Sequence, residues 1–411
     1  MAGIFTTTLS NGLTVILEEI PGVSSAALHW AVPCGSATDD ADRQGASAMM
    51  AEMLLRGAGR LSSREHSDAM DRLGVQRSTG VRVHHLCIDA TLMGGMLHES
   101  LSLIMDMVRA PMMQAEALEP VRSLCLQGLE GLDDDPQQRA MLRVRERHIA
   151  PPFNRHGFGT ADGLQSVTIQ MLTESWARFG TPAGSIFAIA GALNARDTLK
   201  ILENLAHGWQ GHAQEPRKTA LPESGYEHMA QSTAQVHLAM AWDAPREAHA
   251  HSMLERLAVS VLSGSTSGRL FTEVRQRRSL CYSVGASYRA GRDAGVVSLY
   301  AGTTPERAQE TLDVCVQEVI RMKQGVTLAE FQRAVTGLKS HVVMQGESTM
   351  ARAAALSHDF FRIGRARSLE EICAQVDAIS HDQLNDYLRT RETPKFSIVS
   401  IGPDPMNVPG A

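Results

Sequence analysis

The chain has 411 residues, a formal net charge of −6, 43% hydrophobic residues and 20% charged residues. This length predicts two or more domains, and the composition is typical of a soluble globular protein. Binding to a nucleic acid or an anionic membrane would favour a basic face on the protein. The negative net charge therefore makes such partners unexpected.

The cysteines and the N-terminal segment bear on the compartment. No two cysteines stand at C-x-x-C spacing, which predicts reduced thiols and a cytoplasmic protein. The first residues show no basic region followed by an apolar stretch, and no segment has the length of a membrane span. A precursor shortened at its N-terminus would have the same pattern, which leaves a periplasmic location open. The cysteines are Cys34, Cys87, Cys125, Cys281, Cys315 and Cys373.

The first half of the chain alternates predicted strands and helices. Alternating apolar residues favour strands, and runs rich in Ala, Met and Leu favour helices. Asp134 and Asp135 followed by Pro136 predict a new helix, because an acidic cap precedes proline at the first helical position. In order, we predict strands at 13–18 and 25–32, a helix at 44–56, a strand at 81–91, helices at 96–108 and 115–132, a strand at 185–190 and a helix at 195–209.

The second half repeats this order after a polar segment. Residues 213–232 contain two prolines and no periodic pattern, which predicts a linker. The elements that follow are a strand at 235–242, a helix at 249–262, a loop at 263–268, a helix at 269–278, strands at 282–288 and 296–302, a long helix after 304, helices begun by capping boxes at Thr327/Glu330 and Ser380/Gln383, and a strand at 396–401. The shared order predicts an α+β protein with two homologous α/β-sandwich domains, 1–212 and 233–411, of about 200 residues each.

Several segments, taken in order, resemble zinc peptidases of the pitrilysin/insulinase family, which carry the inverted zinc motif. These segments are NGLTVILEE at 11–19, GSATDDADRQGASAMMAEMLLRG at 35–57, PPFNRHGFGT at 151–160 and SGSTSGRLFTEVRQRRSLCYSVGASY at 263–288. The resemblance covers essentially the whole chain. It implies a processing-peptidase-like fold and one half of a clam-shell dimer.

Active members of that family carry H-x-x-E-H on their first helix. Two histidines four residues apart lie on one helical face and reach one zinc ion, and the glutamate activates the zinc-bound water. In this chain the two histidine positions are Ala48 and Glu52, and the glutamate position is Ala51. The third-ligand position falls at or next to Gly128, where a shift of one residue gives Gln127 or Leu129. We therefore expect no metal in this chain and no peptidase activity by this chain alone.

Other residues could in principle replace the lost ligands. Glu130 and Asp133 lie close to the third-ligand position, and His84 and His85 lie on the predicted strand at 81–91. Acidic residues beside a turn are usually solvated, and histidines on alternating strands usually have structural hydrogen bonds. We favour these ordinary roles.

The resemblance implies that one pair of functional residues is retained. Family members that complete the active chamber from the side opposite the zinc carry an Arg and a Tyr seven residues apart, and Arg275 and Tyr282 have this spacing. A guanidinium and a phenol can bind a peptide carbonyl and stabilise the oxyanion that forms on it. Without that context, Arg275 would belong to a solvated basic run and Tyr282 to the core. A possible substrate loop precedes them, or else a plain turn between helices: Ser263, Gly264, Ser265, Thr266, Ser267 and Gly268.

These features lead to one preferred function and two alternatives. We predict a non-catalytic, substrate-binding subunit of a heterodimeric zinc metallopeptidase, whose partner is a homologous chain with an intact H-x-x-E-H motif and the zinc. Its substrate would be an unfolded peptide. The alternatives are a structural scaffold of the type found as core subunits of respiratory complexes, and a homodimeric peptide-binding protein.

Overall fold

The computed structural model describes residues 3–408, which form two compact units. Unit 1 contains the chain up to Gly131, together with Pro151–Thr219 and Gln345–Arg367. Unit 2 contains Leu132–Ala150, Ala220–Met344 and the chain from Ser368 onward. The prediction of an α+β fold with two domains of sheet and helices is confirmed.

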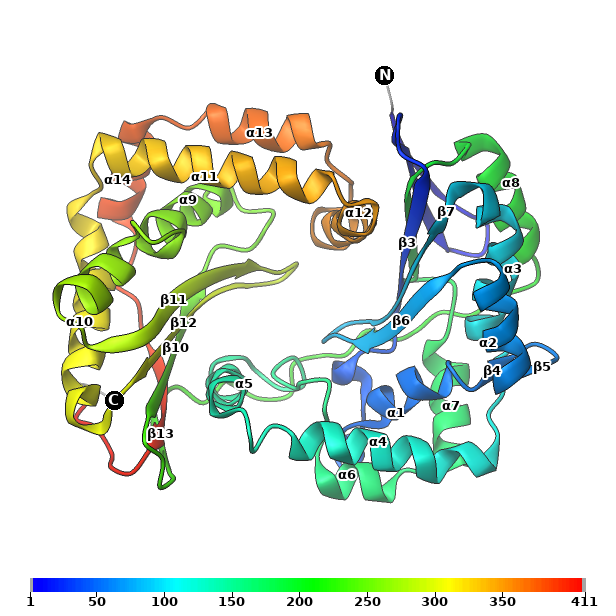
Figure 1. Ribbon diagram of the computed structural model, residues 1–411, viewed down its shortest axis with the longest axis horizontal. Helices are drawn as coiled ribbons and strands as arrows, with labels where there is room; N and C mark the ends of the chain where they lie inside the picture. Colours follow the sequence, from blue (N-terminus) through cyan, green and yellow to red (C-terminus); the bar gives the residue numbers. More distant parts are fainter. Residues whose placement is uncertain (1–2, 409–411) are drawn as a thin grey trace. The chain divides into compact units, whose positions relative to one another are not determined.

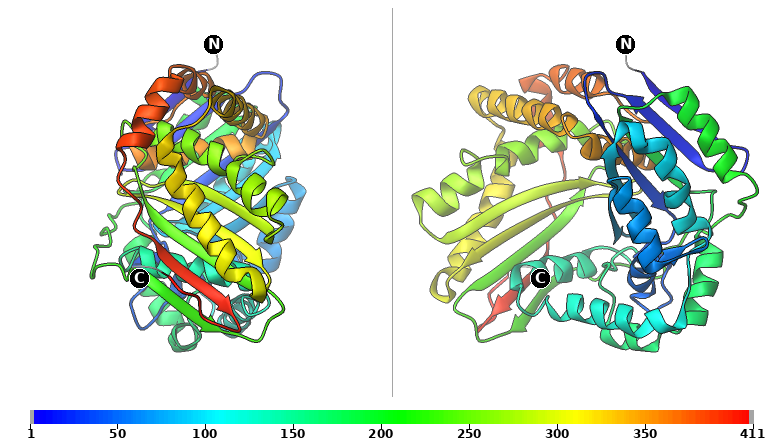
Figure 2. Two further views of the ribbon diagram at one scale, coloured as in Figure 1. Left: turned by 90° about the vertical axis from the view of Figure 1, so that its left-hand side faces the viewer. Right: turned by 45° about the vertical axis from the view of Figure 1, so that its right-hand side comes forward.

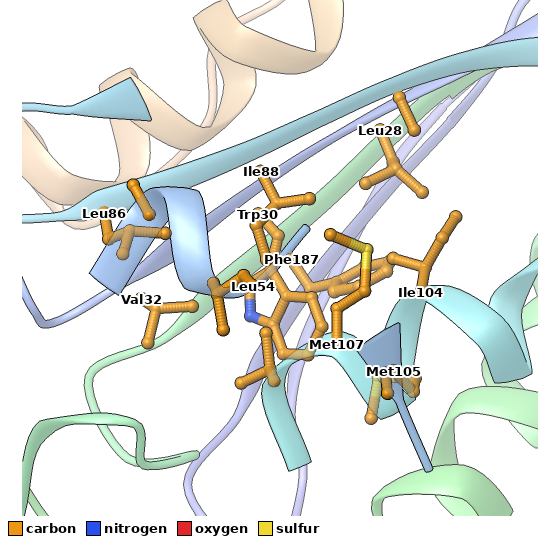
Figure 3. Packing of buried hydrophobic residues seen from close by; sticks show 14 of the residues in the cluster. Leu28, Trp30, Val32, Leu54, Leu86, Ile88, Ile104, Met105, Met107 and Phe187 are labelled. Carbon is orange, nitrogen blue, oxygen red and sulfur yellow. The ribbon is translucent and has the colours of Figure 1, made fainter. Parts of the chain in front are cut away.

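Unit 1 is built on a six-stranded sheet of order β1-β2-β8-β3-β7-β6 (Figure 1). The strands are β1 (Ile4–Thr8), β2 (Thr14–Glu19), β3 (Ser25–Val32), β6 (Gln76–Val81), β7 (Leu86–Met93) and β8 (Ile186–Gly191), and β4 (Gly57–Ala58) pairs with β5 (Leu61–Ser62). The helices are α1 (Ala46–Met53), α2 (Ser63–Arg72), α3 (Leu97–Arg109), α4 (Leu118–Glu130), α6 (Ala161–Ser166), α7 (Ile169–Phe179), α8 (Ala195–Ala206) and α12 (Thr349–Ile363). Trp30 and Phe187 form the centre of the core on one sheet face, against Ile104 and Met107 of α3 (Figure 3).

One predicted strand of unit 1 is wrong in its extent. The segment 81–91 is not a single strand: β6 ends at Val81, β7 begins at Leu86, and the Arg82 N–H bonds the His85 carbonyl across the turn at 2.8 Å. The turn residues 82–85 include no Gly, Pro, Asn or Asp, so the usual turn signals are missing.

Unit 2 is built on a five-stranded sheet of order β11-β12-β10-β13-β9, which Figure 2 shows from two sides. The strands are β9 (Gly225–Ala230), β10 (Val236–Ala244), β11 (Cys281–Ala290), β12 (Gly295–Thr303) and β13 (Ser397–Gly402). The helices are α5 (Pro136–His148), α9 (Ser252–Ser263), α10 (Ala308–Arg321), α11 (Leu328–Gly346), α13 (Leu369–Asp377) and α14 (His381–Thr390). The predicted helix at 269–278 is wound mainly as a π-helix, Phe271–Arg277.

The segment 213–232, predicted as a linker, contains strand β9. This strand runs parallel to β13, and the Tyr226 hydroxyl and His228 Nδ1 both bond the Ser400 hydroxyl, at 2.8 and 2.9 Å. This polar segment has no periodic pattern of its own and forms a strand because it pairs with β13, which lies far along the chain.

Each unit includes one helix from the other half of the chain. Helix α5 packs on β10 and β13 of unit 2, where Ala140 and Val144 meet Ala239 and Val399. Helix α12 packs on β3 and β8 of unit 1 (Figure 1). The division expected at 213–232 thus separates the two halves of the chain in sequence. Packing, however, places α5 from the first half in unit 2 and α12 from the second half in unit 1.

The two sheets have corresponding centres. In unit 1, Trp30 on β3 meets Phe187 edge to face, with ring centroids 4.9 Å apart. In unit 2, Trp242 on β10 meets Phe396 in the same manner at 5.5 Å. The order β2-β8-β3-β7-β6 matches β9-β13-β10-β12-β11, including one parallel pair in each sheet. Equivalent strands with equivalent core pairs support the duplication that the element order predicts. Within residues 3–408, no helix is both long and apolar enough to cross a membrane.

Candidate functional site

Helix α1 carries the positions where the resemblance places the zinc motif. The helix begins after Gly45, whose φ of 112° lies in the left-handed region that favours glycine. The buried Asp39 carboxylate accepts the N–H of Gly45 at 2.8 Å and the N–H of Ser47 at 2.9 Å. The start of the helix is therefore well fixed.

The motif positions themselves offer one ionisable group. Ala51 is buried, and its carbonyl accepts a bond from Thr79 at 2.9 Å, while Ala48 and Glu52 are half-buried. Glu52 lies near Cys125 of α4: burial raises the pKa of that thiol to about 11, and the carboxylate charge adds to the effect. A neutral thiol beside a single carboxylate is a poor zinc site, because zinc binds the thiolate.

The third-ligand position lies on α4 at Gly128. This residue is exposed, and a Cβ atom built there would meet only the Phe158 ring, at 4.0 Å. Residues 3–408 contain no group of three or more His, Cys, Asp or Glu side chains placed to hold a metal ion.

The residues considered as replacement ligands make other contacts. His84 and His85 lie in the β6–β7 turn, and their rings lie 4.9 and 4.6 Å from the Phe361 ring of α12. Asp133 pairs with Arg139 at 3.3 Å, and Glu130 is exposed at the end of α4. These are the contacts of packed or solvated side chains.

Arg275 lies in the π-helical segment of unit 2 and is exposed. Its guanidinium carbon is 5.0 Å from the centroid of the Phe271 ring, a cation–π contact. The other arginines of this run are engaged: Arg277 and Arg278 both bind Glu273, at 2.6 and 2.8 Å, and Arg269 binds Glu330 at 2.7 Å. Within residues 3–408, Arg275 alone in this run has no carboxylate partner. Its guanidinium is thus available for a ligand.

Tyr282 lies at an irregularity near the start of β11. The register of β11 with β12 shifts between Cys281 and Ser283, which leaves Tyr282 without an opposite residue. Such a bulge redirects a side chain, and the Tyr282 side chain is 66% exposed. The alternative that this tyrosine belongs to the core is therefore wrong. Its hydroxyl makes no hydrogen bond with any residue in the described range 3–408.

A tight turn connects the two residues. The N–H of Ser279 bonds the Arg275 carbonyl at 3.1 Å, and the N–H of Leu280 bonds the Val274 carbonyl at 2.9 Å. Ser279 has φ of 52°, the left-handed region that is unusual for a residue other than glycine. The end of the π-helix and the start of β11 are thus held together, which places Arg275 and Tyr282 at the two ends of one turn.

The predicted substrate loop has structural contacts at its start. Ser263 is the last residue of α9, and its hydroxyl accepts the Ala286 N–H of β11 at 2.7 Å. At Gly264 an added Cβ would lie 2.5 Å from the Ser260 carbonyl oxygen, so glycine is needed there for packing. The hydroxyls of Ser265 and Ser267 bond each other at 2.8 Å. Contact of this loop with a substrate stays a prediction.

An ionic pair in unit 1 between buried His29 and half-buried Asp89 was not predicted. His29 Nδ1 lies 2.6 Å from Asp89 Oδ1, and the His29 ring packs edge-on against His358 of α12. Burial by itself would lower the pKa of His29, but hydrogen bonds to Asp89 and Cys87 prevail and raise that pKa to about 9. Burial and the charge of His29 lower the pKa of His358 to about 3. The sequence contains no sign of this pair, since it depends on β3 pairing with β7.

Comparison with known proteins identifies the family. The family model for insulinase (peptidase family M16) matches residues 14–152, and that for the peptidase M16 inactive domain matches residues 166–338. An uncharacterized zinc protease of Mycobacterium tuberculosis is 26% identical over 407 residues, covering 97% of this chain and 92% of that protein. An uncharacterized zinc protease of Bacillus subtilis is 22% identical, covering 96% and 97%.

Solved structures share the fold over nearly the whole chain. A protease from Helicobacter pylori superposes with a TM-score of 0.90 at 16% identity, covering 98% of this chain and all of the other. A Pseudomonas fluorescens structure described as a peptidase M16 inactive domain gives 0.87 at 19% identity, covering 99% of both chains. A chain of complex III from Candida albicans gives 0.83 at 16% identity, covering 97% and 96%. With both domain types matched in order along one chain, this protein belongs to the M16, or insulinase, family of peptidases.

Proposed function

We propose that this chain is the non-catalytic, substrate-binding subunit of a two-chain zinc metallopeptidase. One observation carries the proposal: Arg275 and Tyr282 flank one anchored turn, are both exposed, and have polar groups free of competing partners within residues 3–408. In the same chain, alanine stands at two of the zinc-motif positions.

The zinc belongs to the partner in this proposal. A catalytic zinc needs three protein ligands and an open position for water. Ala48, Ala51 and Gly128 cannot act as ligands or as base, and Glu52 is a single carboxylate. A homologous subunit with an intact H-x-x-E-H motif would supply the metal, the water and the general base, so this chain needs no cofactor of its own.

This chain would act on the peptide carbonyl. Arg275 can donate an N–H group to the carbonyl oxygen, which becomes the oxyanion, and it is free to do so because Glu273 is occupied by Arg277 and Arg278. The Tyr282 hydroxyl can donate to the oxyanion that forms when water attacks. Removing one such donor typically lowers kcat by about 10²–10³-fold. The substrate would be an unfolded peptide, since both donors recognise main-chain groups.

Reconstitution tests the proposal. The chain is mixed with the M16 subunit that has the zinc motif, and cleavage of an internally quenched peptide is followed. We expect activity only in the mixture, and a loss of kcat with Arg275→Ala or Tyr282→Phe. Arg277→Ala is the matched control, since Arg277 is engaged with Glu273 and should be dispensable. An unchanged kcat in both Arg275→Ala and Tyr282→Phe would show that these residues do not bind the peptide carbonyl or the oxyanion.

The scaffold alternative has one observation in its favour. The chain of Candida albicans complex III has the same fold over 97% of this chain. A scaffold would co-purify with a larger assembly, and Arg275→Ala would alter neither the assembly nor any peptide turnover. The homodimer alternative predicts that the chain alone binds peptides and that the zinc-bearing subunit does not change the affinity.

A further inference from the structure

Buried hydroxyl groups lie beneath the turn that joins Arg275 to Tyr282. Thr303, the last residue of β12, and Thr311 of α10 are both fully buried. The Thr303 hydroxyl donates to the Leu280 carbonyl at 2.5 Å, and the Thr311 hydroxyl lies 3.1 Å from that of Thr303. The carbonyl that immediately precedes Cys281 and Tyr282 is thus held from inside unit 2.

Every backbone group of residues 279 and 280 has a partner. Their N–H groups bond the carbonyls of Arg275 and Val274, as described above. The Ser279 carbonyl accepts a bond from the Arg307 guanidinium, and the Leu280 carbonyl accepts that of Thr303. A left-handed serine is an unfavourable conformation that persists only where its surroundings determine it. The four bonds and the π-helix before them are those surroundings.

We infer that Thr303 is a positioning residue for Tyr282. The inference rests on the proposed function and adds to it a group that holds this tyrosine in place. The Tyr282 hydroxyl has no hydrogen bond within residues 3–408, so the backbone at the bulge, which sets the direction of its Cα–Cβ bond, matters for where the phenol lies. Without the Thr303 hydroxyl, the Leu280 carbonyl loses its best donor and the turn can relax towards ordinary φ. A shift of about 1 Å in a reacting group can cost about 10²-fold in rate.

A purely structural role of Thr303 makes a different prediction. In that case its hydroxyl would only satisfy a buried carbonyl, and its loss would lower the stability of unit 2. Activity would then fall by the same factor whether or not Tyr282 has its hydroxyl. A double-mutant cycle separates the two roles.

The test uses the reconstituted two-chain enzyme and the quenched peptide. Thr303→Val keeps the shape and removes the donor, and Thr303→Ser keeps the donor. We expect Thr303→Val to lower kcat about 10- to 100-fold with little change in KM, and Thr303→Ser to retain most activity. In the Tyr282→Phe background, Thr303→Val should cause little further loss. Thr198→Val, at another fully buried threonine on α8 in unit 1, is the matched control and should leave kcat unchanged.

A second measurement needs no partner. The chain contains five tyrosines, so 3-fluorotyrosine labelling gives five ¹⁹F signals, and Tyr282→Phe identifies that of Tyr282. Thr303→Val should shift or broaden this signal while Thr198→Val leaves it unchanged. If Thr303→Val does not fold, Arg307→Met removes the other side-chain donor to the turn from an exposed position and should act in the same direction.

The outcomes separate this inference from the proposed function. Equal losses in both backgrounds, or an unchanged kcat in Thr303→Val while Tyr282→Phe lowers it, would overturn the positioning role and leave the proposed function standing. An unchanged kcat in both Arg275→Ala and Tyr282→Phe would overturn the proposed function and, with it, this inference.

Discussion

Two regions of the duplicated fold, α1 in unit 1 and the segment 271–282 in unit 2, differ in what they expose. In unit 1, α1 offers Ala48, Ala51 and Glu52 at the positions where the resemblance places the zinc motif, and Asp39 accepts the N–H groups of Gly45 and Ser47 at its start. In unit 2, the segment from 271 to 282 contains a π-helix, a left-handed serine and a bulge. Strained backbone often occurs at functional sites, whereas regular, well-capped helices need no function to explain them. The contrast teaches that the unit without ligand-type residues at the proposed zinc positions has a regular, well-capped helix there, while unusual backbone conformations gather near Arg275 and Tyr282 in the other unit.

The largest expected effect is a gain of metal binding. Ala48→His, Ala51→Glu, Glu52→His and Gly128→Glu together restore the ligand set and the base. Because α1 is ordered and Gly128 faces open space, we expect about one zinc per chain by elemental analysis, compared with none for the natural sequence. The same protein without Gly128→Glu is the control and should bind zinc more weakly. Stoichiometric zinc in the natural protein would contradict the expectation that α1 and α4 hold no metal.

A second prediction compares α12 and α5, the two helices that pack in the unit formed mainly by the other half of the chain. Arg352 of α12 is almost fully buried and binds the Glu18 carboxylate of β2 through two nitrogens. Arg352→Ala leaves that carboxylate buried without its partner, so we expect unfolding to become easier by about 3–5 kcal/mol. Arg143 of α5 pairs with Glu227 at a more exposed site, and Arg143→Ala should cost about 0–1 kcal/mol. Urea unfolding measures both, and equal effects would contradict the difference between the helices.

A third prediction compares the effect on kcat of a substitution in each of the two regions. In the two-chain enzyme, Arg275→Ala should lower kcat by about 10²–10³-fold, since an oxyanion donor is lost. Glu52→Ala should leave kcat unchanged, because the proposal assigns no role to the old zinc position. Kinetics with the quenched peptide decide between them, and a large loss in Glu52→Ala would show that α1 still contributes to the site.

The last prediction is a pH dependence of stability in unit 1. The pKa of His29 rises from 6.5 in the unfolded chain to about 9 in the fold, so the charged imidazole stabilises the folded state. That contribution is complete below pH 6.5 and is lost as the pH rises to about 9. Thermal unfolding between pH 6 and 10 should show this decline, and His29→Gln should flatten it. A steeper decline in the variant would contradict the assignment.

Local patterns in the sequence predicted much of the fold. The Asp135 side chain caps α5 with Pro136 in its first turn, and the capping box at Ser380/Gln383 begins α14 as expected. Strand β3 has the predicted limits, Ser25–Val32. These features depend on residues within one turn or one strand, so a single sequence contains them. The absence of an H-x-x-E-H motif is likewise read from the sequence alone.

Long-range pairing decided the rest. Residues 225–230 are a strand only because β13 lies beside them, and His29 has its high pKa only because β7 brings Asp89 to it. The spacing of Arg275 and Tyr282 is readable in the sequence, but their exposure follows from the bulge and from the bonds of Glu273. The sequence by itself thus determined most of the helices and strands and the absence of an H-x-x-E-H motif. Tertiary structure alone decided which helix joins which unit and which polar groups stay free, because burial and pairing depend on residues hundreds of positions apart.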